Sequence, residues 1–390
     1  MKAALISQEG GGISSVTAGL ARSLARRKVD VTVFTGATAS VSQTEKINEQ
    51  LEIVYFPIPD FPPRNLWFQI LNLKKLSEAL SNYDVIHGVS PYASFSLTFF
   101  KKRINKPFVA TIHDSHRPSQ KAFVNQPIST WTLSELGYYF AEFPLYDFSV
   151  ERVLARSDYA VFCSYTLLAE LAAYRNLDYR RVSVIHNGID FDEIDGVGDS
   201  LHESRNDITI IYGGRLYWVK GVMMLMEAFR HLKKDFGNIH LNIFGSGPLR
   251  QKIDEYLVNF DLKDTVTCMG RVPHKTLLSE IKNSDIVAFP SICEAQPMFM
   301  LEAMACRKPV VAFDLPFARE IISSGATGLL ARKADIEDLS NKIGLLVSDE
   351  RLRRRIGQAA YNVVKREHNW DIQVEKYLKV YESALDRHRL

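Results

Sequence analysis

Two glutamates eight positions apart form the most informative pattern in the sequence. Glu294 lies in a predicted strand-to-helix loop within PSICEAQPMFMLEAMACRKPVVAFD, and Glu302 follows inside the predicted helix. Pro297 suits the first helical position, because its missing N–H would be unpaired there in any case. A carboxylate at Glu294 could stabilise an oxocarbenium-like sugar, and Glu302 could accept hydrogen bonds from a ribose. The alternative is an exposed loop glutamate and a helix glutamate paired with a nearby cation.

Two cations precede this pair of glutamates. Arg215 follows Gly213 and Gly214 at the end of a predicted strand, and Lys220 opens the next helix five positions later. Helix N-termini carry unpaired N–H groups and partial positive charge, which favour phosphate. Together these groups could hold a diphosphate and stabilise it as a leaving group. Solvated surface cations are the commoner fate of Arg and Lys, but the position at a strand end favours binding.

Glycine-rich turns follow two other predicted strands. Gly10-Gly11-Gly12 precedes a helix expected to begin near Ser14, and glycine there permits close backbone approach to a ligand or simply a tight turn. In Gly245-Ser246-Gly247 the third glycine of a dinucleotide fingerprint is replaced by Arg250. No strand ending in an acidic residue follows at the expected distance, so the sequence does not predict NAD binding.

A histidine ends a predicted strand in the first half of the chain. His113-Asp114 follows PFVATI. Histidine at a strand's carboxyl end suits proton transfer or a hydrogen bond to a substrate hydroxyl. A histidine that only caps the local backbone is the equally weighted alternative.

Length and composition limit the class of protein. A chain of 390 residues with 46% hydrophobic and 24% charged residues predicts a globular protein of two domains. The net charge of +3 is too small to indicate a nucleic-acid partner. The four cysteines form no CxxC pair, which predicts reduced thiols and a cytoplasmic location. The sequence contains no signal-peptide pattern and no apolar run of membrane-spanning length.

Short β-rich runs alternate with amphipathic helical patterns, which predicts an α/β fold of two parallel-sheet domains. We expect strands at KAALIS, VDVTVFT, LEIVYFPI, DVIHGVS, PFVATIH, DYAVFCS, ITIIYGG, HLNIFGSG, DTVTCMG, DIVAFPS and PVVAFD. Asn187-Gly188 and the polar run after it suit an inter-domain linker. We therefore predict an N-terminal domain at 1–187, a linker at 188–205, a C-terminal domain at 206–370, and a final helix at 371–390 that packs back towards the N-terminal domain.

The combined pattern resembles the retaining family-4 glycosyltransferases of GT-B fold, a group that includes bacterial phosphatidylinositol mannosyltransferases. The resemblance covers nearly the whole chain. It rests on Gly11-Gly12, His113-Asp114, IHNGID at 185–190, GGRLYWVKG at 213–221, GSGP at 245–248, GRVP at 270–273, the Glu294/Glu302 pair with EAMA, and Glu320 before GATGLL. The pair of glutamates with Arg215 and Lys220 upstream is the specific element. The family implies two Rossmann-like domains that face each other across a cleft.

The resemblance implies a role for each matching residue. Arg215 and Lys220 would bind the donor diphosphate, and Glu302 would hold the ribose. Glu294 would contact the transferred sugar near its reacting centre, and His113 would contact the sugar or the acceptor hydroxyl. The loop at Gly11 and Gly12 would close over the diphosphate and acceptor, and the backbone around Arg271 and Val272 would meet the base. The other expected donor-binding residues are Gly214, Gly247, Met298 and Phe299.

The resemblance also implies the reaction and its co-substrate. Such enzymes move a hexose-type sugar from a nucleotide sugar with retention of anomeric configuration, and they usually need no metal and no other cofactor. UDP and GDP are the nucleotides we favour. After Glu294 the family commonly has a glycine-aromatic-glycine run, where this chain has Ala295-Gln296-Pro297. Proline lacks an N–H, so one potential donor to the sugar or phosphate is gone, which leaves the sugar open.

The acceptor side is harder to interpret. The runs at 59–76 and 99–103 mix aromatic residues with cations, as peripheral membrane-binding surfaces do. We therefore expect a glycan, lipid-linked or small-molecule acceptor, with peripheral membrane association through the N-terminal domain as an added expectation. Two alternatives remain: a nucleotide-sugar 2-epimerase or phosphorylase of the same fold, and a non-catalytic protein that binds sugar nucleotides.

Overall fold

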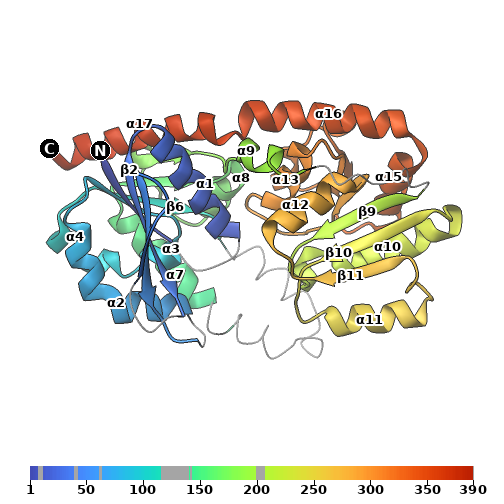
Figure 1. Ribbon diagram of the computed structural model, residues 1–390, viewed down its shortest axis with the longest axis horizontal. Coiled ribbons are helices and arrows are strands. Elements are labelled where there is room, and N and C mark those ends of the chain that lie inside the picture. Colours follow the sequence, from blue (N-terminus) through green and yellow to red (C-terminus); the bar gives the residue numbers. More distant parts are fainter. Residues whose placement is uncertain are drawn as a thin grey trace. The chain divides into compact units, whose positions relative to one another are not determined.

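The computed structural model describes residues 1–7, 12–38, 43–60, 64–115, 140, 143–198 and 207–389. The chain divides into two compact units, each built on a sheet with helices packed on it (Figure 1). The N-terminal unit holds the described residues of 1–121 and 127–188 together with Trp370–Leu390, and the C-terminal unit holds those of Ile189–Asn369. Gly11 and the rest of 8–11 lie outside the described residues.

The N-terminal unit is built on one sheet with strand order β3-β4-β2-β1-β5-β6-β7-β8. All described neighbours are parallel except β3, which runs antiparallel to β4. Its strands are β1 (Lys2–Ile6), β2 (Asp30–Ala37), β3 (Gln43–Lys46), β4 (Leu51–Pro57), β5 (Val85–Gly88), β6 (Phe108–Ile112), β7 (Tyr159–Phe162) and β8 (Val182–Val184). Its helices are α1 (Gly12–Arg26), α2 (Arg64–Leu80), α3 (Pro91–Ser94), α4 (Leu97–Ile104), α7 (Phe143–Arg156), α8 (Tyr165–Ala172) and α17 (Trp370–Arg389).

The C-terminal unit is built on a fully parallel sheet with strand order β11-β10-β9-β12-β13-β14. Its strands are β9 (Ile208–Gly213), β10 (Ile239–Phe244), β11 (Val266–Gly270), β12 (Ile286–Phe289), β13 (Val310–Phe313) and β14 (Leu329–Ala331). Its helices are α9 (Phe191–Asp195), α10 (Val222–Asp235), α11 (Arg250–Asn259), α12 (His274–Asn283), α13 (Met298–Ala305), α14 (Pro316–Arg319), α15 (Ile336–Ser348) and α16 (Glu350–Glu367). This is the doubly wound Rossmann order, so the predicted α/β fold with Rossmann-like units is confirmed.

The central strands β9, β12 and β13 of the C-terminal sheet are buried on both faces, because helices cover both sides. Along β9, Ile210 and Tyr212 belong to one hydrophobic cluster and Ile211 belongs to another. Successive side chains of a strand point to opposite faces, so the two clusters are the cores above and below the sheet. This double burial explains why the strands are nearly continuous apolar runs and not alternating patterns.

Part of the segment expected to be a linker is folded into the C-terminal unit. Ile189, Ile194 and Val197 are buried in one of its cores, and α9 forms from Phe191 to Asp195. Because the run is mostly polar and acidic, its few apolar residues were not predicted to belong to a core. The remainder of the predicted linker, 199–205, lies outside the described residues.

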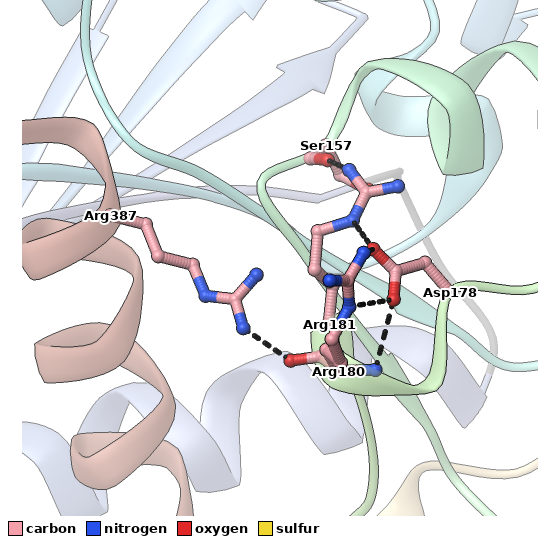
Figure 2. A network of polar contacts seen from close by, with 5 residues as sticks. All are labelled: Ser157, Asp178, Arg180, Arg181 and Arg387. Carbon is pink, nitrogen blue, oxygen red and sulfur yellow. Dashed lines mark hydrogen bonds and ion pairs between the residues drawn. The ribbon is translucent and has the colours of Figure 1, made fainter. Parts of the chain in front are cut away.

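Helix α17 is the last described element, and it packs on the N-terminal unit beside α1 (Figure 1). Its buried side chains include Trp370, Tyr377 and Tyr381. Near its end, Nη2 of Arg387 donates to the backbone carbonyl of Arg180 at 2.6 Å (Figure 2). Arg180 and its neighbour Arg181 are in turn held by the carboxylate of Asp178, which leads into β8 (Figure 2). The last helix is thereby tied to the edge of the first sheet.

Candidate active site

The predicted cations and Glu294 lie at the switch point of the C-terminal sheet. Strands β9 and β12 are neighbours, and the chain leaves them towards opposite sides of the sheet. Ligands of such sheets bind at the carboxyl ends of the strands where the strand order reverses. The loop after β9 carries Arg215 and Lys220, and the loop after β12 carries Glu294. Sheet topology therefore brings together residues that are 74 to 79 positions apart.

Lys220 and Glu294 form an ion pair in this structure. The Nζ of Lys220 donates to Oε1 of Glu294 at 2.6 Å, and the two side chains are 17% and 15% exposed. The same carboxylate oxygen accepts a hydrogen bond from the hydroxyl of Ser291 at 2.8 Å. A charged pair that is largely removed from water interacts more strongly than one on the surface. The pair is fixed in place and still reaches solvent, as a substrate-contacting pair must.

Backbone contacts hold the two loops against each other. The N–H of Ile292 donates to the carbonyl of Val219 at 2.9 Å. Gly221 has a φ of +71°, and a Cβ built there would lie 1.9 Å from the carbonyl oxygen of Pro290. Only glycine fits this left-handed, crowded position. The glycine therefore sets the distance between the loop that carries Lys220 and the loop that carries Glu294.

Arg215 presents an exposed guanidinium on the loop that also carries Lys220. No carboxylate of the described residues pairs with it, and its only side-chain neighbour of note is the ring of Tyr217, 5.5 Å away. Its backbone is fixed, because the hydroxyl of Tyr212 donates to its carbonyl at 3.2 Å. Burial, and then the charge of Glu294, raise the pKa of Tyr212, so the hydroxyl stays protonated as a donor. An exposed arginine side chain on a fixed backbone is well suited to bind an anionic ligand.

The glycine turns after β9 and β10 pack closely together. Gly214 donates its N–H to the carbonyl of Phe244 at 3.0 Å. Gly245 has a φ of +126°, and a Cβ there would lie 1.8 Å from the carbonyl oxygen of Gly214. A Cβ at Gly247 would lie 2.5 Å from the carbonyl oxygen of Leu216. Loop packing thus accounts for these glycines, and donor contacts by Gly214 and Gly247 stay predictions.

The side chains of Met298, Phe299 and Val272 pack towards the core of the C-terminal unit. The ring of Phe299 covers Gly213, where a Cβ would come within 2.4 Å of it. These three residues can therefore offer a donor their backbone rather than their side chains. Helix α13 begins at Met298, directly after Pro297. Arg271 is exposed and has no described hydrogen-bond or ion-pair partner.

Glu302 lies apart from the ion pair and has a partner that the sequence analysis missed. Its carboxylate is buried, and Oε1 accepts from Nε2 of His274 at 2.9 Å. The other ring nitrogen, Nδ1, contacts Oε1 of Glu193 at 3.0 Å. His274 follows GRVP at a strand-to-helix turn, the same signal that singled out His113. The other unpredicted member of the site is Ser291, a residue whose type carried no distinguishing signal.

The N-terminal unit contributes His113, directly after β6. Its ring hydrogen-bonds to the backbone of Val89, and Nε2 is buried without a hydrogen-bond partner among the described residues. Burial lowers the pKa of His113 to about 4, so the ring is neutral at physiological pH. Gly12 forms the first residue of α1, two positions before the expected start. The predicted site residues that the structure describes are therefore divided between the units, with His113 and Gly12 in the first and the others in the second.

Among the described residues, no group of three or more His, Cys, Asp or Glu side chains is arranged to hold a metal ion. None of the described helices is both long enough and apolar enough to cross a bilayer.

Comparison with known proteins gives the family. Residues 10–193 match the model of glycosyltransferase family 4, and residues 199–363 match that of glycosyl transferases group 1. The D-inositol 3-phosphate glycosyltransferase of Xylanimonas cellulosilytica is 25% identical over 402 residues, which cover 97% of this chain and 93% of that protein. The two matched ranges meet near the boundary between the units, and together they cover most of the chain.

Solved structures agree on the fold. The sucrose-phosphate synthase of Thermosynechococcus elongatus has a TM-score of 0.78 at 19% identity, over 99% of this chain and 100% of that one. Anabaena HepE, solved in complex with UDP and glucose, has a TM-score of 0.74 at 17% identity, over 98% of this chain and 100% of that one. On these findings the chain belongs to the group 1, family-4 glycosyltransferases of GT-B fold, and it is a glycosyl-transferring enzyme.

Proposed function

We propose that this enzyme is a retaining, metal-independent glycosyltransferase that moves a hexose-type sugar from a nucleotide sugar to a glycan, lipid-linked or small-molecule acceptor. The observation that carries the proposal is the Lys220–Glu294 pair at the switch point of the C-terminal sheet, with the guanidinium of Arg215, which pairs with no carboxylate of the described residues, on the same loop as Lys220. An anion and two cations are what a departing diphosphate and a cation-like sugar require.

The donor would be bound by groups with distinct tasks. Arg215 and Lys220 would hold the diphosphate, and Glu302 would accept hydrogen bonds from the ribose. UDP and GDP are the nucleotides we propose. The presence of UDP in the HepE structure supports UDP, since that protein shares the fold.

The chemical step would exchange one bond at the anomeric carbon for another. The bond from that carbon to the diphosphate oxygen breaks, and the acceptor oxygen forms its bond on the same face of the sugar. The acceptor proton passes to the departing diphosphate oxygen. Arg215 and Lys220 stabilise the charge that develops on the diphosphate, and Glu294 stabilises the positive charge on the sugar. His113, as a neutral ring, would hydrogen-bond the sugar or the acceptor hydroxyl.

We further propose a cytoplasmic location and peripheral contact with a membrane. All four cysteines are free, which suits a reducing compartment. On α2, Ile70 and Leu71 are 55% and 56% exposed, and the exposed Lys74 and Lys75 follow one turn later. Phe99 of α4 is also 55% exposed. Apolar side chains beside lysines favour the surface of an anionic bilayer.

The test is a donor screen followed by product analysis. Purified protein is incubated with UDP-, GDP-, ADP- and dTDP-hexoses, with and without EDTA, and thermal stabilisation and sugar release are measured. We expect one nucleotide class to stabilise the protein equally in EDTA. With an acceptor that supports turnover, the product should keep the donor's anomeric configuration by NMR.

Four results would contradict the proposal. An inverted product would exclude retention, and loss of activity in EDTA would exclude metal independence. Epimerised donor, or phosphate-dependent cleavage without acceptor, would favour the epimerase or phosphorylase. Stabilisation by a donor that is never turned over would favour a non-catalytic binding protein.

A further inference from the structure

His274 lies between two carboxylates that come from different helices. It is the first residue of α12, and its ring contacts Glu302 of α13 through Nε2 and Glu193 of α9 through Nδ1. The distances are 2.9 Å and 3.0 Å, both within hydrogen-bond range. The three helices α9, α12 and α13 thus meet at this one ring.

The two contacts fix the charge of the ring. An ionised carboxylate only accepts hydrogen bonds, so each ring nitrogen must carry a proton to bond with its partner. A ring protonated on both nitrogens is an imidazolium. Its hydrogen bond to Glu302, reinforced by the charges of Glu302 and Glu193, raises the pKa of His274 to about 9. At neutral pH this site therefore holds one positive charge between two negative ones.

Glu302 depends on this cation more than Glu193 does. The side chain of Glu302 is 9% exposed, against 37% for Glu193. A buried carboxylate without a cation or donors is costly and tends to take up a proton. Among the described residues, His274 is the only side chain that hydrogen-bonds or pairs with Glu302. Removing the ring would leave the carboxylate without its fixed partner.

The geometry leaves Glu302 able to accept further hydrogen bonds. A carboxylate offers about four lone-pair sites on two oxygens, and His274 occupies one of them, on Oε1. A ribose hydroxyl can therefore bind the same carboxylate while His274 holds it. The hydrogen bond from the imidazolium keeps the orientation of the carboxylate constant, and an ionised acceptor forms the stronger hydrogen bond.

We propose that His274 is a positioning residue for the donor nucleotide, which orients the carboxylate of Glu302 so that Glu302 can accept hydrogen bonds from the ribose. This role rests on the proposed function, since it assumes that Glu302 meets the ribose. His274 itself contacts neither the ribose nor the reacting atoms.

The experiment compares ribose with a ribose analogue that lacks the hydroxyls. Dissociation constants are measured by calorimetry for UDP, for GDP and for the 2′,3′-dideoxy form of whichever binds wild type more tightly. The variants are His274→Ala and His274→Gln, because glutamine can still donate a neutral N–H to Glu302. His240→Ala is the matched control: its side chain is also 40% exposed, and its ring pairs with Asp207 at 3.2 Å. His240 lies at the start of β10, at the other end of the sheet.

We expect His274→Ala to weaken nucleotide binding about tenfold, the scale of one charge-assisted hydrogen bond. His274→Gln should recover part of that loss, and His240→Ala should match wild type. The dideoxy nucleotide should bind wild type and His274→Ala equally, because it lacks the hydroxyls. In a transfer assay, the donor KM should rise while kcat changes less than about twofold, since the contact is made in both ground and transition states.

The contrary outcomes separate the two proposals. A wild-type protein that binds neither UDP nor GDP would overturn the donor site and the role of His274 with it. Tight wild-type binding that His274→Ala leaves unchanged would overturn the role of His274 alone. An equal loss for the ribose and dideoxy nucleotides would also overturn it, because it would indicate general damage to the fold of the site.

Discussion

At the scale of single residues, one cation of the site is paired with a carboxylate and the other is not, and a bound ligand would change this pairing. Lys220 is neutralised by Glu294 across 2.6 Å, whereas Arg215 has no described acidic partner. Replacing one member of a largely buried pair leaves the other uncompensated, so the effect of a substitution includes more than the loss of one contact. A substitution that preserves shape therefore gives the clearest test.

The Glu294 charge is tested by Glu294→Gln. The amide keeps the size of the side chain but cannot stabilise a cation-like sugar. We expect kcat to fall by a factor on the order of 100 or more, with nucleotide affinity within about threefold of wild type. Initial rates against the donor identified by the screen measure this. Asp254→Asn is the control, because Asp254 forms an exposed pair with Arg250 on α11; wild-type rates in Glu294→Gln would remove Glu294 from the reaction.

Two histidines, the buried His87 and the half-buried His113, should make the stability of the protein depend on pH in the acid range. Burial lowers the pKa of His87 to about 3 and that of His113 to about 4. A charge on His113 disfavours protonation of His87, the charge of Asp114 favours protonation of His113, and Tyr377 and Tyr381 of α17 pack against His87. Below about pH 6.5 the unfolded chain binds protons at these sites and the folded chain does not. The free energy of unfolding should therefore be highest above about pH 6.5 and should decrease as the pH falls towards 4.

The slope should be as much as about 1.4 kcal/mol per pH unit for each histidine. Urea unfolding between pH 7.5 and 4.5 measures it, and His87→Gln should have a shallower slope than wild type. A slope that is the same in both proteins would contradict the assignment of His87.

At the scale of elements, the site depends on how closely two loops approach. The β9 and β12 loops meet where Gly221 faces the carbonyl of Pro290. Neither loop by itself holds Lys220 and Glu294 together, and each is positioned by a strand buried on both faces. Flexibility at this contact would change the distance between the charged groups.

Gly221→Ala should disturb both stability and activity. The added Cβ needs a left-handed backbone and meets the Pro290 oxygen at 1.9 Å. We expect a loss of about 2 kcal/mol or more in unfolding free energy, together with reduced transfer. Gly237→Ala is the control, since a Cβ there has no atom within 4 Å and needs no unusual φ. Equal melting temperatures for the two variants would show that the loops adjust to the added methyl.

Helix α17 shows a second dependence between elements. The hydroxyl of Tyr381 lies 2.7 Å from Nδ1 of His87, and Thr111 meets the other ring nitrogen at 2.7 Å. Since Thr111 lies two residues before His113, the helix that ends the described chain supports the strand that carries a predicted catalytic residue. The last twenty or so residues therefore belong to the structure of the N-terminal unit.

At the scale of the whole molecule, each unit has its own Rossmann-like sheet, and the proposed tasks differ between them. The donor groups Arg215, Lys220, Glu294 and Glu302 all belong to the C-terminal unit. The exposed apolar side chains of α2 and α4 belong to the N-terminal unit, where we propose that an acceptor or a membrane would be met.

The membrane proposal predicts a vesicle interaction carried by α2. The full-length protein should co-sediment with vesicles that contain about 30% anionic lipid, and less so as salt rises, because lysines contribute part of the attraction. The double variant Ile70→Glu and Leu71→Glu should lose most of this binding. Val258→Glu is the control, since Val258 is 59% exposed but lies on α11 of the other unit. Equal binding by both variants would exclude α2 as the contact.

Much of the fold was determined by local sequence. The run PVVAF contains strand β13, which is buried on both faces and therefore needs an unbroken run of apolar residues, and HLNIF belongs to β10, where buried and half-buried residues alternate. The short strands β3, β8 and β14 were missed. Gln43–Lys46 is polar and exposed throughout, so only its pairing with β4 makes it a strand. Leu329–Ala331 is too short to show the apolar pattern by which a strand is recognised in a sequence.

The candidate site was determined in part by sequence and in part by tertiary structure. Residue types at strand ends identified Glu294, Arg215 and Lys220, because parallel sheets bring those ends to one edge. The sequence by itself could not pair Lys220 with Glu294, since the distance between two loops depends on a Gly221–Pro290 contact across 69 positions. Nor could it place His274 between Glu193 and Glu302. Those contacts arise from the packing of three helices, which no local pattern encodes.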